Sequence, residues 1–476
     1  MHVIDKLSTT KAWSKAIAKP ATEFAESKLQ VISGSIPDRL RGTLYRNGPA
    51  RLERGGIRVG HWFDGDGAIL RVNFSNEGVT GNYRYVQTAG YEEEATAGKL
   101  LYGNYGMTAP GAFWNQWLKP IKNAANTSVL ALPDKLLALW EGGKPHALDL
   151  QTLATKGMDS LDGLESNLAY SAHPKCDRQT GEIFNFGVSP GKDATLNIYK
   201  SDRTGKIIKK SATKLDGVSL VHDFVLAGQY LVFFVPPVRV NPLPILLGLS
   251  SYSDALQWQP KLGTQWLIFD RDSLSLVNRG ETDAWYQWHF SNGYVDSSGT
   301  IVAGVVRYED FETNQYLKEV ATGETHTTAK STLWQVHLHP DQGVIANKQI
   351  VDRHCEFPIV PPQQVGHGES ATYLSVYRQG TDSSKELLGA IARFDPKTDR
   401  LTVADMGENH YPTEPIFAPN PENPDNGWII TVVYDGNTDT SEVWVLDSEG
   451  LDREPICRLS LPSVIPPGFH GTWQPA

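Results

Sequence analysis

A tight polar turn between two strand-like runs occurs seven times in this chain, and this repeat most constrains the fold. Each turn follows an apolar residue and is rich in Asp, Asn, Ser, Thr or Gly. The turns begin at Phe74, Leu148, Tyr199, Phe269, Leu338, Phe394 and Leu446, at intervals of 51 to 74 residues. Such intervals exceed the ~40 to 45 residues of a compact propeller blade, but they fit four-stranded blades with insertions. We therefore predict an all-β fold, a seven-bladed β-propeller, although sandwiches and barrels also contain such turns.

The predicted domain organisation is simple. We expect residues 1–30 to form a polar, weakly helical lead-in and residues 31–476 to form a single propeller. The chain has 43 Gly and 29 Pro, which favours many turns over long helices. Insertions near residues 105–127 and 235–262 lack blade character, so we predict that they form a helical and loop cap over one end of the axis.

Both insertions are apolar. In the first, Phe113, Trp114, Trp117, Leu118 and Ile121 fall on one face of a possible helix. The second is rich in proline, which argues against an ordinary helix, and we predict contact with a membrane or an apolar ligand through its residues Val235, Val238, Leu243, Ile245, Leu246 and Leu247. The alternatives are a helix that only packs on the propeller and a loop buried within its own cap.

Charge and cysteine content restrict partners and compartment. The net charge is -10 and no basic run occurs, which excludes nucleic acid as the principal partner. The three cysteines are far apart and have no C-x-x-C spacing, so neither disulfides nor a thiolate metal site is indicated. No signal peptide or membrane-spanning run is apparent. We expect a cytoplasmic protein, with peripheral contact to a membrane through the apolar insertions.

Four histidines occupy the same position relative to the repeated turn. His173, His222, His289 and His470 follow the turns at Leu148, Tyr199, Phe269 and Leu446 by 25, 23, 20 and 24 residues. In a propeller, the strand that follows an outer hairpin is the innermost strand of the next blade, which lines the central channel. One such histidine alone would be an ordinary buried core residue. Four in the same position predict one site on the axis.

Carboxylates follow two of the other turns. Glu356 and Glu414 lie 18 and 20 residues after Leu338 and Phe394, among apolar and proline residues. Glu141 lies in similar apolar company but not at the same position. The turn at Phe74 leads only to the acidic run 92–94, which we interpret as solvent-exposed.

Four imidazoles with no cysteine suit a borderline transition metal such as Fe(II), Cu or Zn. Zinc is usually saturated by four such ligands, whereas six-coordinate iron would keep up to two positions for O₂ or substrate. Acidic residues that accept the second ring N–H would fix each ring and balance the charge of the ion. The pattern predicts a catalytic metal site, with Glu356, Glu414 and Glu141 behind the ligands.

At these residues the chain resembles the carotenoid cleavage oxygenase family, in its cyanobacterial apocarotenoid-oxygenase-like branch. The resemblance covers nearly the whole chain. It is carried by the segments 42–49, 63–67, 125–127, 136–143, 171–174, 221–224, 356–358, 414–417 and 469–473.

The resemblance implies a seven-bladed propeller with one non-haem Fe(II) per chain, held by His173, His222, His289 and His470. It also implies that Glu141, Glu356 and Glu414 support three of these rings, and that Thr127 lies near an open position of the iron. The implied reaction splits a conjugated C=C bond of a carotenoid or apocarotenoid with O₂ and gives aldehydes. A metal-dependent polyene isomerase and a non-catalytic carotenoid-binding propeller are the alternatives.

Overall fold

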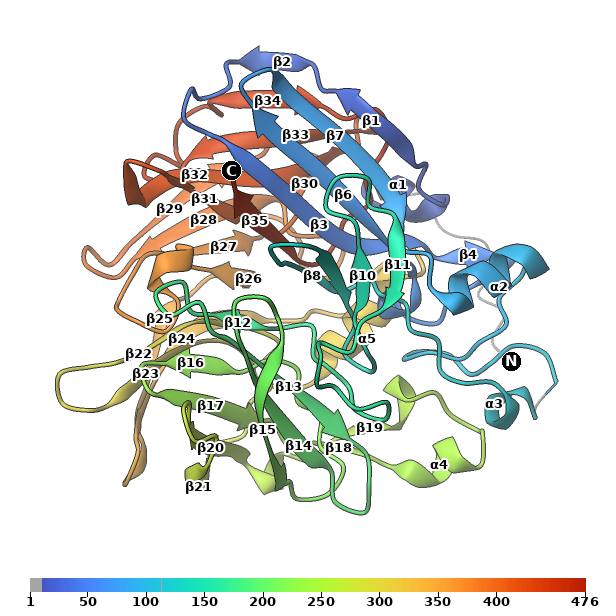
Figure 1. Cartoon of the computed structure of the whole chain (residues 1–476), viewed down its shortest axis with the longest axis vertical. Coiled ribbons are helices and arrows are strands. Elements are labelled where there is room, and N and C mark those ends of the chain that lie inside the picture. The colour runs from blue at the N-terminus through green and yellow to red at the C-terminus, as the bar shows by residue number, and fades with distance from the viewer. Residues whose placement is uncertain (1–10, 113) are drawn as a thin grey trace.

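The structure, a computed structural model, describes residues 11–112 and 114–476. Its described part contains seven antiparallel sheets of four or more strands, arranged as the blades of a β-propeller (Figure 1). Each of the seven repeated turns connects the third and fourth strands of one blade, counted outward from the axis. The predicted fold class is therefore confirmed.

The first blade joins the two ends of the chain. Its innermost strand is the C-terminal β35 (Gly471–Pro475), which pairs with β3 (Gly42–Arg51). Outward follow β6 (Asp66–Ser75), β7 (Gly78–Tyr85) and a fifth strand, β1 (Phe24–Lys28). Figure 1 shows the red β35 beside the blue β3. This pairing closes the ring of blades.

Blades two to six each run outward in chain order. Their strands are β8 (Ser128–Ala131), β9 (Leu136–Leu139), β10 (His146–Leu148) and β11 (Thr155–Met158); β12 (Lys175–Cys176), β13 (Ile183–Ser189), β14 (Thr195–Ser201) and β15 (Ile207–Lys214); β16 (Val225–Ala227), β17 (Tyr230–Val235), β20 (Thr264–Asp270) and β21 (Leu276–Thr282); β22 (Phe290–Val295), β23 (Ile301–Tyr308), β24 (Ser331–His339) and β25 (Gly343–Val351); and β26 (Cys355–Ile359), β27 (Thr372–Val376), β28 (Ala390–Asp395) and β29 (Arg400–Asp405).

The seventh blade is built around β32 (Asn423–Asp435). Two short strands, β30 (His410–Pro412) and β31 (Ile416–Asn420), share its inner edge, and β33 (Thr440–Asp447), β34 (Cys457–Ser460) and β2 (Val31–Gly34) follow outward. The break between β30 and β31 lies at Glu414.

Middle strands of the blades are largely buried because neighbouring blades cover both of their faces. Every residue of β9 is buried, and so is every residue of β17 except Tyr230. Phe186, Phe224 and Phe233, for example, pack between blades three and four. Outer strands such as β15 and β21 instead carry exposed polar residues.

The N-terminal segment differs from the expected polar lead-in. It contains one helical turn, α1 (Lys15–Ala18), and Trp13, Ala16 and Ile17 are buried against the propeller. Strand β1 within it extends the first blade. Residues 1–10 lie outside the described part of the chain.

A cap of long connections covers one end of the axis. It contains α2 (Ala89–Ala97), α3 (Asn115–Leu118), α4 (Pro242–Leu246) and α5 (Glu312–Val320), with the short hairpins β4–β5 (Glu53–Arg54, Ile57–Arg58) and β18–β19 (Val238–Val240, Leu256–Trp258) and the 3-10 turns at Trp62–Asp64, Ser253–Ala255 and Pro260–Leu262. A further 3-10 turn, Pro362–Gln364, lies between β26 and β27 at the opposite end of the axis. Helix α5 and its loop were not anticipated as part of the cap.

The acidic run 92–94 was wrongly interpreted as solvent-exposed. It lies in α2, which Thr88 caps at its start and Gly98 ends with a φ of 65°. Glu92 and Glu93 are exposed, but Glu94 is buried. Lys122 Nζ lies 2.6 Å from Glu94 Oε2 and also pairs with Asp66 of β6. This buried pairing ties the cap to the first blade.

The apolar insertions differ from expectation in three details. Val235 and Val238 are buried in the blade and its adjoining hairpin, so neither can reach a membrane. Proline does not prevent a helical turn at α4, because Pro242 occupies its first position and Asn241 caps it. Helix α3 is only four residues long, and Phe113 lies outside the described residues.

Ile245 is half-buried, whereas eight other apolar side chains of these insertions are solvent-exposed. They are Trp114, Trp117, Leu118, Ile121, Leu243, Leu246, Leu247 and Leu249, and we call them the apolar patch. The indole N–H of Trp117 donates to the carbonyl of Leu246, which joins α3 to α4. Figure 1 shows the two helices on the same side of the molecule.

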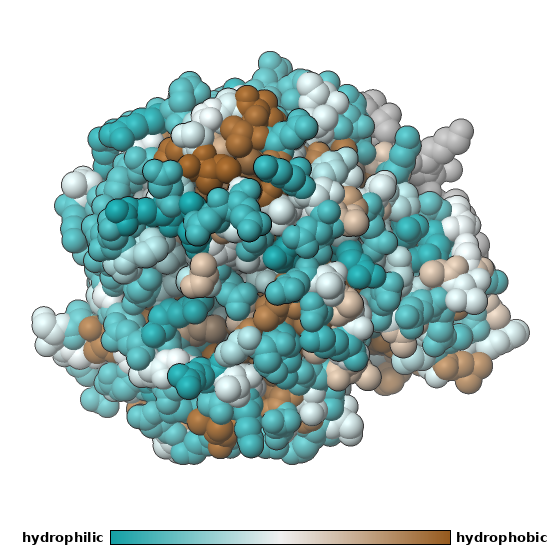
Figure 2. All heavy atoms as spheres, turned by 45° about the horizontal axis from the view of Figure 1, so that its top comes forward, coloured by the Kyte–Doolittle hydropathy of each residue, from teal (hydrophilic) through white to brown (hydrophobic). Residues whose placement is uncertain are grey.

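On the face in Figure 2, hydrophilic residues predominate and hydrophobic residues gather in small groups. Among the helices in the described residues, none has the length and apolar character needed to cross a bilayer.

Candidate metal centre

The four histidines lie where the chain enters the innermost strands. His173 and His222 precede β12 and β16 by a few residues, and His289 and His470 directly precede β22 and β35. Because innermost strands begin at the capped end of the axis, all four side chains reach the same level of the channel. The repeat therefore brings residues up to 297 positions apart into one cluster.

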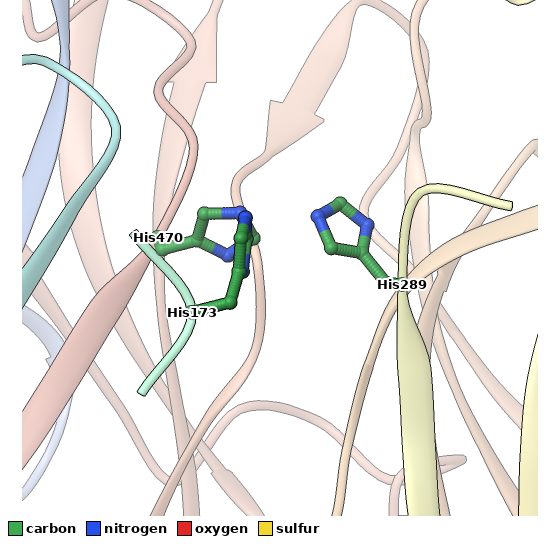
Figure 3. A group of neighbouring side chains, drawn as sticks. All are labelled: His173, His289 and His470. Atoms are coloured by element: carbon green, nitrogen blue, oxygen red, sulfur yellow. The ribbon is translucent and has the colours of Figure 1, made fainter. Parts of the chain in front are cut away.

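The imidazole rings converge on one point. Ring centroids are 4.3 Å apart for His173 and His222, 5.3 Å for His173 and His289, and 4.8 Å for His173 and His470. The centroid of His289 lies 4.8 Å from that of His470 and 5.2 Å from that of His222. Figure 3 shows three of these rings facing one another from separate segments.

Several ring nitrogens in this cluster have no hydrogen-bond partner. The Nε2 atoms of His173 and His289 are buried, and neither has a partner among the described residues. One nitrogen from each of His173, His289 and His470 lies within 4.8 Å of the other two. Buried polar atoms are rarely left unpaired, so these nitrogens fit a shared metal ion.

The protonation state also fits a metal. Burial, reinforced by the neighbouring imidazoles, lowers the pKa of His173 and of His289 well below its usual value. These rings are therefore neutral at physiological pH, the form in which imidazole binds a metal.

Glu356 holds the ring of His289. Its Oε2 lies 2.5 Å from His289 Nδ1, and its Oε1 accepts a hydrogen bond of 2.8 Å from the Tyr308 hydroxyl. The backbone N–H of Phe357 donates to the same carboxylate. Burial raises the pKa of Glu356 to about 7. The carboxylate fixes the Nδ1 side of the ring, which leaves Nε2 directed at the cluster.

Glu414 holds His470 in the same way. Its Oε1 lies 2.9 Å from His470 Nδ1, and its Oε2 accepts a hydrogen bond from the Gly471 N–H. Burial alone would raise the pKa of Glu414, but His470, Arg46 and the Gly471 N–H outweigh it and lower the pKa. Arg46 also binds the backbone carbonyls of Glu414 and Phe469, which locks the two segments together.

Glu141 is placed differently from the other two carboxylates. It follows β9 and is only partly buried. Its Oε1 lies 2.5 Å from His222 Nδ1 and 3.4 Å from His173 Nε2, without the geometry of a hydrogen bond to either. The three carboxylates thus approach three different rings, and His173 alone has no carboxylate at its Nδ1 side among the described contacts.

Thr127 occupies the corresponding position of the second blade, directly before β8. It follows the turn at Phe74 by 53 residues, because the insertion containing α2 and α3 intervenes. At the usual spacing, the acidic run 92–94 follows the turn at Phe74, so the spacing alone does not indicate Thr127. The Thr127 hydroxyl donates to Asn126 Oδ1, its carbonyl accepts from the His470 N–H, and its side chain lines the cavity over the histidines.

A cavity of about 470 Å³ opens over the cluster. It is lined by His222, His289, His470 and Thr127, and by many aromatic residues. Phe63, Trp140 and Phe469 belong to the motifs of the family resemblance, whereas no site role was predicted from the sequence for Trp62, Tyr105, Phe186, Tyr252, Trp288 and Tyr308. Ile121 of the apolar patch also lines it. Its volume is that of a small-molecule site.

Comparison with known proteins agrees with this arrangement. Residues 17–475 match the model of the family described as RPE65, retinal pigment epithelial membrane protein. An apocarotenoid-15,15'-oxygenase of Synechocystis sp. is 32% identical over 458 residues, which cover 93% of this chain and 92% of the relative. The chain belongs to the RPE65 and carotenoid cleavage oxygenase family.

Two further members of this family are informative. A resveratrol cleavage oxygenase of Aspergillus fumigatus is 26% identical, with 94% of this chain and 92% of the relative covered. The solved structure of a cobalt-substituted apocarotenoid oxygenase from Synechocystis superposes with a TM-score of 0.90 at 30% identity, with 98% of each chain covered. Proteins similar to this chain over most of its length are therefore named for different substrates, an apocarotenoid in one case and resveratrol in another.

Proposed function

We propose that this protein is a non-haem Fe(II) dioxygenase that cleaves a conjugated C=C bond of a carotenoid or apocarotenoid with O₂ and releases aldehydes. The observation that supports this most is a cluster of buried imidazoles beside a largely apolar cavity: His173, His289 and His470 bring ring nitrogens within 4.8 Å of one another, and His222 lies next to them in a second group with His173 and Glu141. The names of the family members support the reaction class.

The proposed ligands are His173, His222, His289 and His470, which would hold one Fe(II) per chain. An all-imidazole set suits iron, copper or zinc, and the apocarotenoid oxygenase from Synechocystis has a solved structure described as cobalt-substituted. When bound, the iron would supply the activation of O₂ that cleavage of an alkene requires. The carboxylates of Glu141, Glu356 and Glu414 would keep the rings in place.

The other residues would position the substrate. Thr127 would restrict one side of the metal, because its side chain lines the cavity beside the cluster. Trp288 and Phe469 flank the histidines and present aromatic surfaces to a flat polyene. Holding one bond of the polyene over the metal would determine where cleavage occurs.

The cavity lining favours a neutral substrate. Among the described residues, no Lys or Arg lines the cavity, whereas Glu141 and Glu356 both line it. A carboxylate end group away from the metal would find no Lys or Arg partner among these residues and would lose its hydration. An uncharged polyene, alcohol or aldehyde fits the site better than an acid.

The apolar patch is the proposed entry side. It carries Leu243, Leu246 and Leu249 on α4 and the loop after it, with Trp117 and Leu118 of α3 beside them. Ile121 belongs both to this patch and to the cavity wall. We propose that the patch touches a lipid bilayer, from which an insoluble polyene would pass directly into the cavity, in a protein that is otherwise cytoplasmic.

Incubation of iron-loaded protein with a carotenoid and with an apocarotenal under ¹⁸O₂ tests the proposal. We expect about one iron per chain by elemental analysis, and labelled aldehydes by mass spectrometry. A product isomerised without label would identify an isomerase. Binding without turnover, unchanged by His222→Ala, would identify a carotenoid-binding propeller. Either result contradicts the proposed function.

A further inference from the structure

The cavity continues past the histidines to the opposite side of the axis. Its entry side is lined by Trp140, Val188 and Tyr252, which belong to blades two, three and four: Trp140 and Tyr252 lie in cap loops, and Val188 lies near the end of β13. Its other side is lined by Tyr316, Tyr377, Leu387 and Tyr411, from blades five to seven, and we call this side the far chamber. The tyrosines give the far chamber a polar component, while its walls stay buried.

The hydroxyl protons of the far chamber are already engaged. The hydroxyl of Tyr377 donates to that of Tyr316 at 3.2 Å, and Tyr316 donates to the Glu386 carbonyl at 3.0 Å. Tyr411 donates to Glu386 Oε2 at 2.8 Å. Burial raises the pKa of Tyr377 to about 12, so this proton remains on the phenol at physiological pH. None of these three tyrosine hydroxyls is thus free to donate a hydrogen bond to a ligand.

Its acceptor capacity is not exhausted. A phenol oxygen has acceptor sites as well as its one proton. The hydroxyl oxygen of Tyr316 accepts a hydrogen bond from Tyr377. The hydroxyl oxygen of Tyr411 lies near the backbone of Trp13. The oxygen of Tyr377 accepts a hydrogen bond from none of the described residues. Of the three tyrosine hydroxyls of the far chamber, Tyr377 is therefore the one whose oxygen is left to accept a hydrogen bond from a ligand.

The N-terminal segment closes the far chamber from outside. The indole N–H of Trp13 donates to the Lys385 carbonyl, and Lys11 Nζ lies 3.3 Å from Glu386 Oε1. Trp13 is fully buried against the same core as Tyr316 and Leu387. An end group in this chamber would have left water, and any hydrogen bond it needs must come from the chamber walls.

We propose that the far chamber holds one end group of the polyene, and that Tyr377 selects an end that carries a hydroxyl. This inference rests on the proposed function. A hydroxyl can donate to the Tyr377 oxygen without disturbing existing hydrogen bonds. A terminal aldehyde needs a donor, and Tyr377 could serve it only by turning away from Tyr316, which exchanges one hydrogen bond for another. A hydrocarbon end gains nothing there.

Binding under anaerobic conditions tests this without turnover. Three polyenes of equal length, with a terminal hydroxyl, aldehyde or methyl group, are titrated into the iron-loaded full-length protein, and quenching of tryptophan fluorescence gives the Kd. We expect the hydroxylated polyene to bind roughly threefold to tenfold more tightly than either analogue, the effect of one neutral hydrogen bond. Equal affinities would overturn the inference, whereas failure of all three to bind would overturn the proposed function with it.

Two variants separate this role from a general packing role. Tyr377→Phe should remove the preference for the hydroxyl, whereas Tyr434→Phe, a buried tyrosine outside the cavity lining, should keep it. Tyr316→Phe deprives the Tyr377 proton of its acceptor, so affinity for the aldehyde should rise towards that for the alcohol. The inference would be overturned if Tyr377→Phe still bound the hydroxylated polyene most tightly. It would also be overturned if Tyr316→Phe did not raise the affinity for the aldehyde.

Discussion

The backbone next to Glu356 shows how tightly individual residues are held at the axis. Phe357 has a φ of 52°, in the left-handed region that a bulky side chain rarely adopts. Its ring stacks on His289 with centroids 5.4 Å apart, and its N–H donates to the Glu356 carboxylate. Such a conformation costs on the order of 1–3 kcal/mol and persists only when its surroundings impose it.

Glu356→Gln should weaken metal binding. The amide keeps the size of the side chain but loses the negative charge that supports His289, and loss of such a partner typically lowers metal affinity by about 10- to 100-fold. Competition with a chelator, followed by iron analysis, measures this. Glu182→Gln, a carboxylate paired with Lys200 and Arg271 away from the axis, should leave the affinity unchanged. Equal affinity in both variants would contradict the role of Glu356.

Sequence could indicate the residues of the cluster where the repeat spacing is regular. His173, His222, His289 and His470 follow their turns by similar intervals, and the structure brings them together. Thr127 and Glu141 could not be found by spacing, because an insertion displaces the first and the second lies after another strand. Only the family resemblance indicated Thr127, whereas Glu141 was indicated by its apolar neighbours as well as by the resemblance. The aromatic cavity wall gave no periodic signal at all.

At the scale of single elements, the cap is fixed by a buried charge network rather than by apolar contact alone. Lys122, at the end of the first insertion, lies between Glu94 of α2 and Asp66 of β6. Arg54 Nη2 donates to the same Asp66 at 3.1 Å. The insertion carries Ile121 in the cavity wall, so this network also positions the proposed entrance.

Glu94→Gln should destabilise the protein. Removing one charge from a buried pair leaves Lys122 incompletely compensated, a change that typically costs about 3–5 kcal/mol. Chemical denaturation at neutral pH measures the loss. The matched variant Glu92→Gln, on the exposed face of the same helix, should stay within about 0.5 kcal/mol of the parent. If both variants unfold at the same denaturant concentration as the parent, the network does not anchor the cap.

Leu246→Asp should reduce binding to phospholipid vesicles if α4 enters a bilayer. A charge there would have to leave water, while the folded state changes little because the side chain is exposed. Vesicle co-sedimentation, with thermal unfolding as a check on folding, gives the answer. Met158→Asp alters an equally exposed apolar residue on β11, away from the patch, and should bind as the parent does. Undiminished binding by Leu246→Asp would rule out contact through α4.

At the scale of the whole molecule, the propeller could be predicted because one local signal recurs in every blade. The closure of the ring could not, since the pairing of β35 with β3 joins segments more than 400 residues apart and neither carries a turn signal. Helix α5 was missed because it lies inside an insertion, where the hairpin repeat gives no information. Blades are also joined by side chains, as at Asp177.

Asp177 should make the molecule sensitive to acid. It accepts hydrogen bonds from Arg271 of blade four and from His367 in the loop between β26 and β27 of blade six. Burial opposes its ionisation, but these partners and two backbone N–H groups lower its pKa below the usual range. A carboxyl whose pKa is lower in the folded state stabilises the fold fully above its unfolded pKa of about 4, and this stabilisation is lost as pH falls.

We therefore expect Asp177→Asn to be less stable than the parent at pH 7, with a difference that shrinks as the pH falls from about 5 to about 2. Denaturant unfolding across this range measures it. Asp202→Asn, in an exposed turn, should show a smaller difference at pH 7. A difference for Asp177→Asn that stays constant with pH would contradict the pairing.

The most direct test of the account is a crystal structure of iron-loaded protein with anomalous diffraction recorded on both sides of the iron absorption edge. The account predicts a single strong peak per chain on the propeller axis, within about 2.0–2.3 Å of one ring nitrogen from each of His173, His222, His289 and His470. A map with no iron peak at this position, or with a peak that one or more of the four rings does not reach, would contradict it.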